Sequence, residues 1–300
     1  FMPSASTLTG VIANRDFDMS QQEFETPDFE TLDFETLVIQ DQKPVLRVML
    51  NRPKLANAMN LKMVNELMAV MEKVENEHYR VLIISGGHGN FCAGGDIKDM
   101  QSAGADKKAL VELNRAFGHM ITKADHLPAA VICALEGAVL GGGFGLACVS
   151  DLAIAVEKTQ FGLPETSLGI IPAQIAPFVV KRIGLTQTRR MALFGNRIKA
   201  QEAMNLGLIH QVVEDNEQLE DAVNKAVKLA IKCAPQASQV TKALIHNIDK
   251  QDLESLLDQA AEDFAKAVMG EGREGGAAFM QKRLPAWADV STINKEKETD

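Results

Sequence analysis

The hydrophobic positions of this chain divide it into an early part with strands and a later part with helices. Short apolar runs bounded by glycine, proline or acidic residues predict strands over 37–40, 45–51, 81–85, 129–135 and 151–156. Apolar residues at helical spacing predict helices over 61–74, with Asn60 as N-cap, and over 107–124. This alternation up to about residue 195 is typical of an α/β fold with buried strands.

From Arg197 onward the pattern is amphipathic and helical, and we expect no further strand of useful length. The predicted helices span 201–205, 218–233, 236–248 and 253–268. Residues 271–276 indicate a glycine-rich hinge before a last helix over 276–287. We therefore divide the chain into a flexible N-terminal extension (1–36), an α/β core (37–196) and a helical C-terminal region (197–300).

Composition narrows the classes of function. The formal net charge of −9 argues against a nucleic-acid or membrane-surface partner, and no apolar run approaches the ~20 residues of a membrane span. Four cysteines without a CxxC pair favour a reduced, cytoplasmic compartment. Six scattered histidines predict no metal site. Residues 1–18 resemble neither a signal nor a transit peptide, and Met19 is a candidate natural start.

Glycine-rich turns carry the main chemical signal. The run Gly141–Gly143 precedes a segment, 144–149, that resembles a buried helix, and a second turn, Ala93–Asp96, also follows a strand. By itself such a run predicts either a tight turn or a helix N-terminus whose N–H groups face negative charge. If both turns face one pocket, two N–H groups form an oxyanion hole for a carbonyl that becomes an enolate. Phosphate binding, the alternative use of such turns, is disfavoured because the sequence contains no GxxxxGK[ST] motif.

An enolate needs an acid/base partner, and Glu165 is the best candidate. It follows a proline at the end of an apolar segment, where burial would raise its pKa. A solvated turn is the alternative. We assign structural roles to the other titratable candidates: helix capping for Asp96, strand termination for Glu136, capping or a salt bridge for Asp151, and surface positions for His88 and His119.

Three motifs together resemble the enoyl-CoA hydratase/isomerase, or crotonase, family. They are Phe91-Cys-Ala-Gly-Gly-Asp-Ile-Lys, Leu140-Gly-Gly-Gly-Phe-Gly-Leu-Ala and Phe161-Gly-Leu-Pro-Glu-Thr-Ser-Leu. With Asn51-Arg-Pro and the C-terminal motifs, the resemblance covers about residues 37–288 in order. It implies a crotonase-like α/β spiral of ββα units, a helical C-terminal trimerisation region, and a homotrimer or dimer of trimers.

The resemblance also implies a lyase of acyl-CoA catabolism that binds its substrate as a CoA thioester. No separate cofactor is implied, because coenzyme A is part of the substrate. By motif, Gly95 and Gly142 would donate the oxyanion N–H groups, and Glu165 matches the second family glutamate. Substrate contacts are implied for Lys54 and Ala56 along the CoA, for Ala93, Asp96 and Ile97 around the acyl thioester, and for Lys282, in this or a neighbouring subunit, at the CoA phosphate or adenine.

The sequence departs from typical hydratases at Gly145, where they carry a first glutamate. The segment 172–177 also differs, and it is similar to bacterial hydratases of branched glutaconyl-CoA esters, such as isohexenylglutaconyl-CoA and methylglutaconyl-CoA hydratases. A hydratase would have to use Glu165 alone. A Δ3,Δ2-enoyl-CoA isomerase needs one glutamate only, and a non-catalytic acyl-CoA-binding protein is the alternative of another class.

Overall fold

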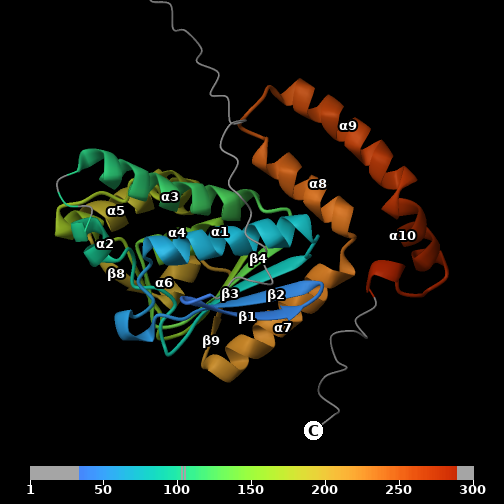
Figure 1. The fold of residues 1–300 in the computed structure, drawn as a ribbon. Helices are drawn as coiled ribbons and strands as arrows, with labels where there is room; N and C mark the ends of the chain where they lie inside the picture. Colours follow the sequence, from blue (N-terminus) through green and yellow to red (C-terminus); the bar gives the residue numbers. More distant parts are fainter. Residues whose placement is uncertain (1–33, 103, 105, 289–300) are drawn as a thin grey trace, which may run out of the picture. The chain divides into compact units, whose positions relative to one another are not determined.

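A six-stranded sheet forms the centre of the fold (Figure 1). The computed structural model describes residues 34–102, 104 and 106–288, all within one compact unit that spans residues 33–300. The strand order is β1-β2-β3-β4-β6-β9, and only the β1–β2 pair is antiparallel. The bounds are β1 Leu37–Gln42, β2 Val45–Leu50, β3 Val81–Gly86, β4 Ala130–Leu135, β6 Leu152–Val156 and β9 Gln211–Val213.

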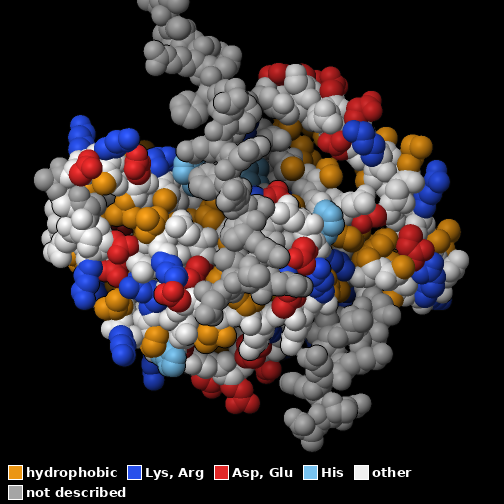
Figure 2. Space-filling model, viewed as in Figure 1, with side chains coloured by type: hydrophobic (Ala, Val, Ile, Leu, Met, Phe, Trp, Pro, Cys, Tyr) orange, Lys and Arg blue, Asp and Glu red, His pale blue; other side chains and the backbone are white. Residues whose placement is uncertain are grey.

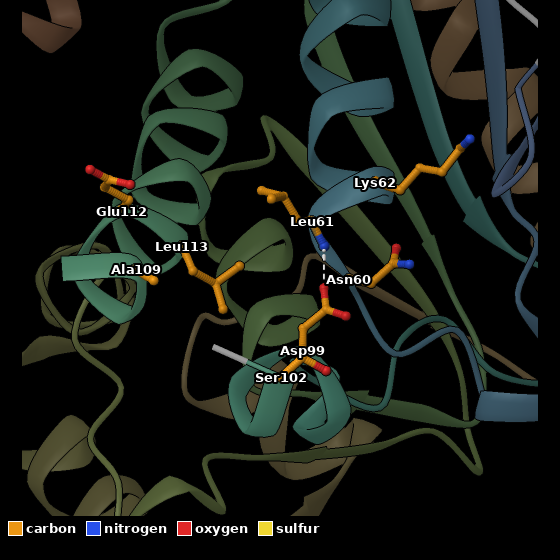
Figure 3. A pocket seen from close by; sticks show the side chains of 8 residues that line it. All are labelled: Asn60, Leu61, Lys62, Asp99, Ser102, Ala109, Glu112 and Leu113. Carbon is orange, nitrogen blue, oxygen red and sulfur yellow. Dashed lines mark hydrogen bonds between the residues drawn. The ribbon is translucent and has the colours of Figure 1, made fainter. Parts of the chain in front are cut away.

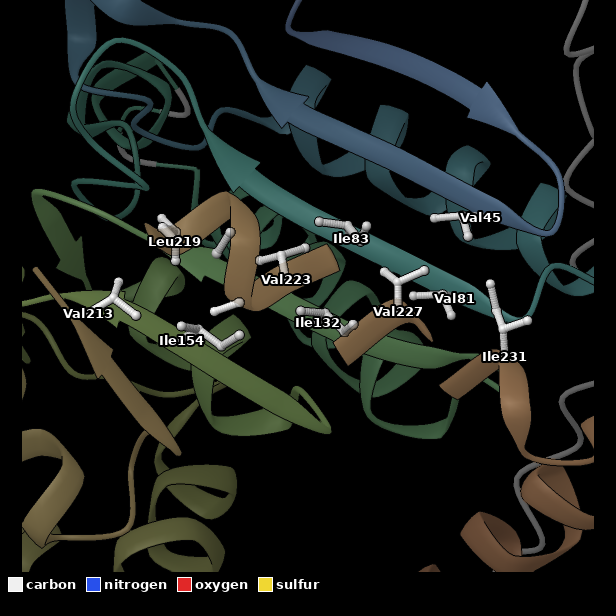
Figure 4. Packing of buried hydrophobic residues seen from close by; sticks show 12 residues of the cluster. Val45, Val81, Ile83, Ile132, Ile154, Val213, Leu219, Val223, Val227 and Ile231 are labelled. Atoms are coloured by element: carbon white, nitrogen blue, oxygen red, sulfur yellow. The ribbon is translucent and has the colours of Figure 1, made fainter. Parts of the chain in front are cut away.

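One face of this sheet is covered by α7 (Asn216–Lys232), as Figure 4 shows. Successive strand residues point to opposite faces, so Val81 and Ile83 of β3 meet α7 while Leu82 and Ile84 are buried on the other side. Such burial on both faces explains why the parallel strands are continuous apolar runs. α7 contributes residues spaced three or four apart, namely Leu219, Ala222, Val223, Val227 and Ile231.

Three further helices do not belong to the layer formed by α7: α1 (Leu61–Asn76), α3 (Lys107–His126) and α4 (Gly142–Val149). Among them, α1 packs on α3, and α3 packs on α4. Asn60 caps α1 as expected, because its side chain accepts a hydrogen bond from the backbone N–H of Met63 at 3.0 Å. Asp106 caps α3 in the same way. The short α2 (Ile97–Ser102) precedes α3, and the one-turn 3₁₀ helix Pro53–Leu55 precedes α1.

A second, three-stranded sheet is built from β5 (Ala138–Leu140), β7 (Gln160–Gly162) and β8 (Arg197–Lys199). β4 passes to β5 and then α4, while β6 passes to β7, the 3₁₀ turn Glu165–Leu168 and α5 (Ala176–Phe194). These two successive turns of the chain each add one strand to each sheet before a helix. This repetition confirms the expected spiral of ββα units.

Three helices follow α7 and form the C-terminal layer: α8 (Pro235–His246), α9 (Leu253–Met269) and α10 (Glu271–Met280). Lys242 of α8 donates to the carbonyl of Ala129 at 3.1 Å and pairs with Asp151 at 2.7 Å. Asp151 also accepts from the N–H of Val131, which confirms its predicted structural role. None of the helices among the described residues is both long enough and apolar enough to cross a membrane.

Two expectations about the C-terminal region were wrong. Two strands lie in this region, β8 from Arg197 and β9 from Gln211, and α6 (Ala200–Asn205) lies between them; each strand has three residues, too short for periodicity to reveal. Residues 271–276 are helical, and α10 ends at Met280, before Lys282. Two of the glycines there allow close packing, because a Cβ on Gly272 would lie 2.9 Å from the carbonyl oxygen of Ala267 and one on Gly275 would lie 3.2 Å from Trp287.

The N-terminal extension lies largely outside the described residues. At its end, Thr36 is buried and hydrogen-bonded to Glu66 of α1. The division at 36/37 and 196/197 stays a prediction, although β8, β9 and α7 all join the sheets of the preceding core.

Candidate active site

The two glycine turns singled out in the sequence lie side by side. An isolated bridge joins Cys92 to Val139 of β5, so the segment before Gly94 runs parallel to the strand before Gly141. A Cβ placed on Gly141 would lie 3.3 Å from the Cα of Gly94. The ββα spiral therefore brings together two turns that are far apart in sequence, since Gly94 and Gly141 are separated by 47 positions.

Both turns leave backbone donors unused. Met59 and Gly95 form a second isolated bridge, in which Met59 donates to the carbonyl of Gly94 and Asp96 donates to the carbonyl of Met59. The N–H of Gly95 points away from this bridge, and Gly142 is the first residue of α4. Neither N–H has a hydrogen-bond acceptor among the residues that the structure describes. Gly95 is exposed and Gly142 half-buried, so both donors are accessible.

Glycine is required in these turns for conformational reasons. Gly94 has φ +106° and Gly141 has φ +49°, a region that side chains disfavour. The helix that begins at Gly142 adds its dipole to the free N–H groups, because the first N–H groups of a helix have no intrahelical acceptor. Backbone N–H groups such as these, one of them at the N-terminus of α4, suit an oxygen that gains negative charge.

Glu165 faces the same place. Its Oε1 would lie 3.0 Å from a Cβ on Gly141, and its Oε2 is buried without a hydrogen-bond partner among the described residues. Pro164 and the buried Leu163 hold the start of the 3₁₀ turn that carries it. Burial raises the pKa of the Glu165 carboxyl above its usual 4.5, as the sequence predicted. A carboxylate with a free oxygen and a raised pKa can act as a general base.

The position of the absent first glutamate is filled from another element. Gly145 lies on α4, one turn after Gly142, and a Cβ there would be 2.4 Å from Cγ2 of Ile175 and 3.4 Å from Cδ1 of Ile121. Ile175 is buried and directly precedes α5. Position 145 therefore accommodates no side chain while Ile175 keeps its place, and an apolar wall stands where a second carboxylate would be.

The implied substrate contacts fall into two groups. Ala56 accepts a hydrogen bond from the N–H of Ala93 at 3.0 Å, which places the exposed Lys54 and its loop beside the Gly94–Gly95 turn. Ile97 is half exposed at the start of α2. Lys282 follows α10, with φ +55°, and within the described part of the chain no hydrogen bond joins it to either glycine turn. Its substrate role stays a prediction.

The competing titratable residues have structural partners or surface positions. Asp96 is buried, pairs with Arg52 at 2.9 Å and accepts from the N–H of Lys98, the capping role expected of it. Glu136 accepts from the side chain of Asn216 at the start of α7. His88 is exposed, and His119 lies on the exposed face of α3.

A histidine cluster that the sequence spacing did not indicate lies where α3 meets α8. Asp125, His126 and His246 place ligand atoms within 4.8 Å of one another, close enough to hold a metal ion. His126 already contacts Lys250 at 3.1 Å and the carbonyl of Thr122. The two histidine rings also stack, with centroids 4.7 Å apart. These contacts join α8 to α3.

A surface cavity of about 590 Å³ lies between the N-termini of α1 and α3 and the helix α2 (Figure 3). Leu61 and Leu113 point into it, and Asp99 accepts a hydrogen bond from the N–H of Leu61 at 2.7 Å. Its lining does not include Glu165, Gly95 or Gly142. The cavity is lined by both apolar and charged side chains. It offers no acid or base beside the glycine turns.

Sequence reasoning missed the residues that replace the first glutamate. Ile175 approaches Gly145, while the neighbouring Gln174 and the α3 residue Arg115 meet over Gly118, a glycine within a helix. A helix-interior glycine costs about 1 kcal/mol, so it was a usable signal of close approach. It gave no indication of which residue approaches.

Comparisons with known proteins agree with this geometry. A family model described as enoyl-CoA hydratase/isomerase matches residues 40–290. The 2,3-dehydroadipyl-CoA hydratase of Escherichia coli is 33% identical over 255 residues, which cover 83% of this chain and 97% of the relative. Two solved structures are each 53% identical with a TM-score of 0.83 and cover 85% of this chain and 100% of their own: an enoyl-CoA hydratase/isomerase from Marinobacter aquaeolei and AtuE of Pseudomonas aeruginosa.

Proposed function

Because this chain belongs to the enoyl-CoA hydratase/isomerase family and is an enoyl-CoA hydratase-like enzyme, we propose that it adds water to an α,β-unsaturated acyl-CoA. The proposal is supported by the approach of Glu165 to Gly141, whose Cβ would lie 3.0 Å from Oε1, and by three groups without a hydrogen-bond partner among the described residues: the N–H groups of Gly95 and Gly142 and the Oε2 of Glu165. A site that only binds CoA esters has no use for a buried carboxylate without a partner, because such a group destabilises the fold.

The reaction follows from these groups. The thioester oxygen accepts from Gly95 and Gly142, which draws electrons from the Cα–Cβ double bond. Glu165 removes a proton from water as the water oxygen bonds to Cβ, and the electron pair moves to the thioester oxygen to form the enolate. Glu165 then returns the proton to Cα, which restores the carbonyl. One carboxylate thus serves as base and acid, and the two N–H groups stabilise the charge between these steps.

Isomerisation is the second candidate, and the Gly145–Ile175 contact favours it. With no space for a second carboxylate, moving a proton between Cα and Cγ needs only Glu165 and the two N–H groups. Both activities use the same enolate, so the outcome depends on whether water reaches Cβ.

The acyl group is proposed to be branched and glutaconyl-type, following the resemblance of segment 172–177. The 53% identity to AtuE is consistent with a shared subfamily. The name of the Escherichia coli relative, 2,3-dehydroadipyl-CoA hydratase, also describes a thioester of a dicarboxylic acid.

A homotrimer or dimer of trimers is proposed from the apolar surface of the C-terminal helices. Figure 2 shows hydrophobic side chains at the surface over α9 and α10. Phe264 is 72% exposed and Phe279 85% exposed, and Met269 and Met280 are also exposed. Apolar area of this extent marks an interface, and a second copy of the chain offers the same area in return. Light scattering of the purified chain measures the assembly, and a monomer would contradict it.

The test of the function supplies a panel of 2-enoyl-CoA and 3-enoyl-CoA esters in deuterated water. Hydration predicts loss of the enoyl absorbance and a 3-hydroxyacyl product with one deuterium at Cα. Isomerisation predicts deuterium at Cα or Cγ without a hydroxyacyl product. Binding without turnover or label across the whole panel would overturn both activities.

A further inference from the structure

The segment that fills the space at Gly145 also contacts a positively charged side chain. Beside Ile175, the Oε1 of Gln174 accepts a hydrogen bond from Nη1 of Arg115 at 2.7 Å, and its Nε2 donates to Oδ1 of Asn114 at 2.6 Å. The segment before α5 is thereby attached to α3. The segment thus positions an apolar side chain and a guanidinium next to each other.

Arg115 is held in place without being neutralised. No carboxylate among the described residues forms an ion pair with it, unlike Arg52 with Asp96 or Arg190 with Glu202. Its Nη2 lies 3.4 Å from Nδ1 of His119. Partial burial and the neighbouring Arg115 both lower the pKa of His119, which favours its neutral form. The guanidinium keeps its full positive charge.

The contact between Arg115 and Gln174 depends on a glycine in α3. Gly118 is buried, and a Cβ there would lie 2.0 Å from Oε1 of Gln174 and 2.5 Å from Nη1 of Arg115. Any other residue at position 118 would displace the pair. A glycine in the middle of a helix lowers the stability of that helix. The presence of Gly118 is explained by the Gln174 and Arg115 side chains, which occupy the space that a larger residue would fill.

The pair is within reach of the acyl group. Gly145 is three residues after Gly142, which is about 4.5 Å along the helix axis. Ile175 touches position 145, and Gln174 and Arg115 follow directly. An acyl chain whose thioester oxygen binds at Gly142 would therefore extend along Ile175 toward Arg115. Nη1 uses one of its two N–H groups on Gln174, so the guanidinium of Arg115 keeps further N–H donors for a group on that chain.

From this arrangement we propose that Arg115, positioned by Gln174, binds a free carboxylate on the acyl group, beside an alkyl branch that packs on Ile175. The inference rests on the proposed function and names the recognition residue of that site. A guanidinium pairs with a carboxylate through two parallel hydrogen bonds, which selects a dicarboxylic half-thioester over a neutral one. Such a substrate also explains why the first glutamate is absent, since a carboxylate at position 145 would repel the free carboxylate of the acyl group.

The experiment compares two esters that differ only in this charge, 3-methylglutaconyl-CoA and 3-methylpent-2-enoyl-CoA. Arg115→Gln should lower kcat/KM for the first by about tenfold to a hundredfold, mainly through KM, because a hydrogen bond to a charged group is lost. Turnover of the neutral ester should change less than twofold. Arg115→Lys should recover part of the loss, since it keeps the charge but not the planar fork. Lys108→Gln, an equal charge change on the exposed first turn of α3, should leave both esters unchanged.

Equal effects of Arg115→Gln on the two esters, or a wild-type preference for the neutral one, would overturn the inference and leave the hydratase standing. If the enzyme hydrates neither ester, the proposed function fails separately. Calorimetry with the saturated analogues 3-methylglutaryl-CoA and 3-methylpentanoyl-CoA then still decides the role of Arg115. Selective weakening of the first by Arg115→Gln supports it, and equal affinities in wild type and variant refute it.

Discussion

Two glutamates are withdrawn from water in this molecule, and their surroundings differ completely. Glu66 of α1 accepts hydrogen bonds from the N–H of Glu35 at 3.1 Å and from the N–H and hydroxyl of Thr36, so its oxygens are occupied. Glu165 has a buried Oε2 that no group of the described residues meets, and its pKa is raised by burial. The first carboxylate attaches the chain that enters β1. The second is left free at the glycine turns.

The difference shows how a fold separates structural from chemical carboxylates. A buried acid with donors stabilises the fold, whereas a buried acid without them costs about 1–3 kcal/mol and persists where a ligand uses it. If this distinction is correct, removal of the two side chains should affect different measurements. The expected effects are given from the largest to the smallest.

The largest effect is expected from Glu165→Gln, which keeps the shape of the side chain but removes the base. Turnover of the preferred enoyl-CoA should fall by about 10²–10⁴-fold, the usual contribution of general acid/base catalysis. The loss of enoyl absorbance measures the rate, and circular dichroism checks the fold. Turnover at the wild-type rate would remove Glu165 from the mechanism.

Glu66→Ala should give the complementary result. It leaves the N–H groups of Glu35 and Thr36 unpaired, which lowers the free energy of unfolding by about 2–4 kcal/mol. Urea denaturation measures this change. The kcat of the protein that remains folded should stay within about threefold of wild type, since Glu66 is on α1 and contacts neither glycine turn. A selective loss of kcat with unchanged stability would break the comparison.

Gly145→Glu tests whether the site accepts another carboxylate beside Glu165. The added side chain collides with Ile175, and overpacking should lower stability by about 1–3 kcal/mol. The pair of changes Gly145→Glu and Ile175→Ala should be less destabilising than the sum of the single changes, by about 1 kcal/mol. Denaturation of all four proteins in the cycle measures this coupling. Strict additivity would show that Ile175 does not exclude a side chain at 145.

The smallest effect concerns stability and pH. Below the usual pKa of 4.5, Glu165 is protonated in both the folded and the unfolded chain, so its burial has no ionisation penalty. As pH rises through the higher folded pKa, the buried group must ionise without a partner and the wild type loses stability. Glu165→Gln should therefore match wild type in acid and exceed it by about 1 kcal/mol at mildly alkaline pH.

Urea midpoints across this pH range measure the difference, and Glu66→Gln serves as the control because its native partners are donors. A Glu165→Gln variant that is less stable than wild type at mildly alkaline pH would mean that Glu165 has a stabilising partner. In kinetics the same raised pKa predicts that kcat/KM falls on the acid side at a pH above 4.5.

Much of the core was predictable because local signals and packing agree there. The apolar runs at 81–85 and 129–135 became the parallel strands β3 and β4, since both of their faces are buried. Asn60 and Asp151 took the roles that their residue types suggest. Prediction failed at 271–276, because the conformational freedom of glycine was weighed without the close contacts of Gly272 and Gly275 that the helix needs.

By itself the sequence was sufficient to nominate two glycine turns and one glutamate as the candidate site, because glycine at strand ends and a glutamate after an apolar segment are local features. It also marked Gly145 as the place where a second acid is missing. Only the tertiary structure decided what replaces that acid, since Ile175 fills the space at Gly145 and Gln174 joins the segment before α5 to Arg115 of α3. Such contacts join residues about 60 positions apart, and no local pattern specifies them because side-chain packing depends on how the whole spiral closes.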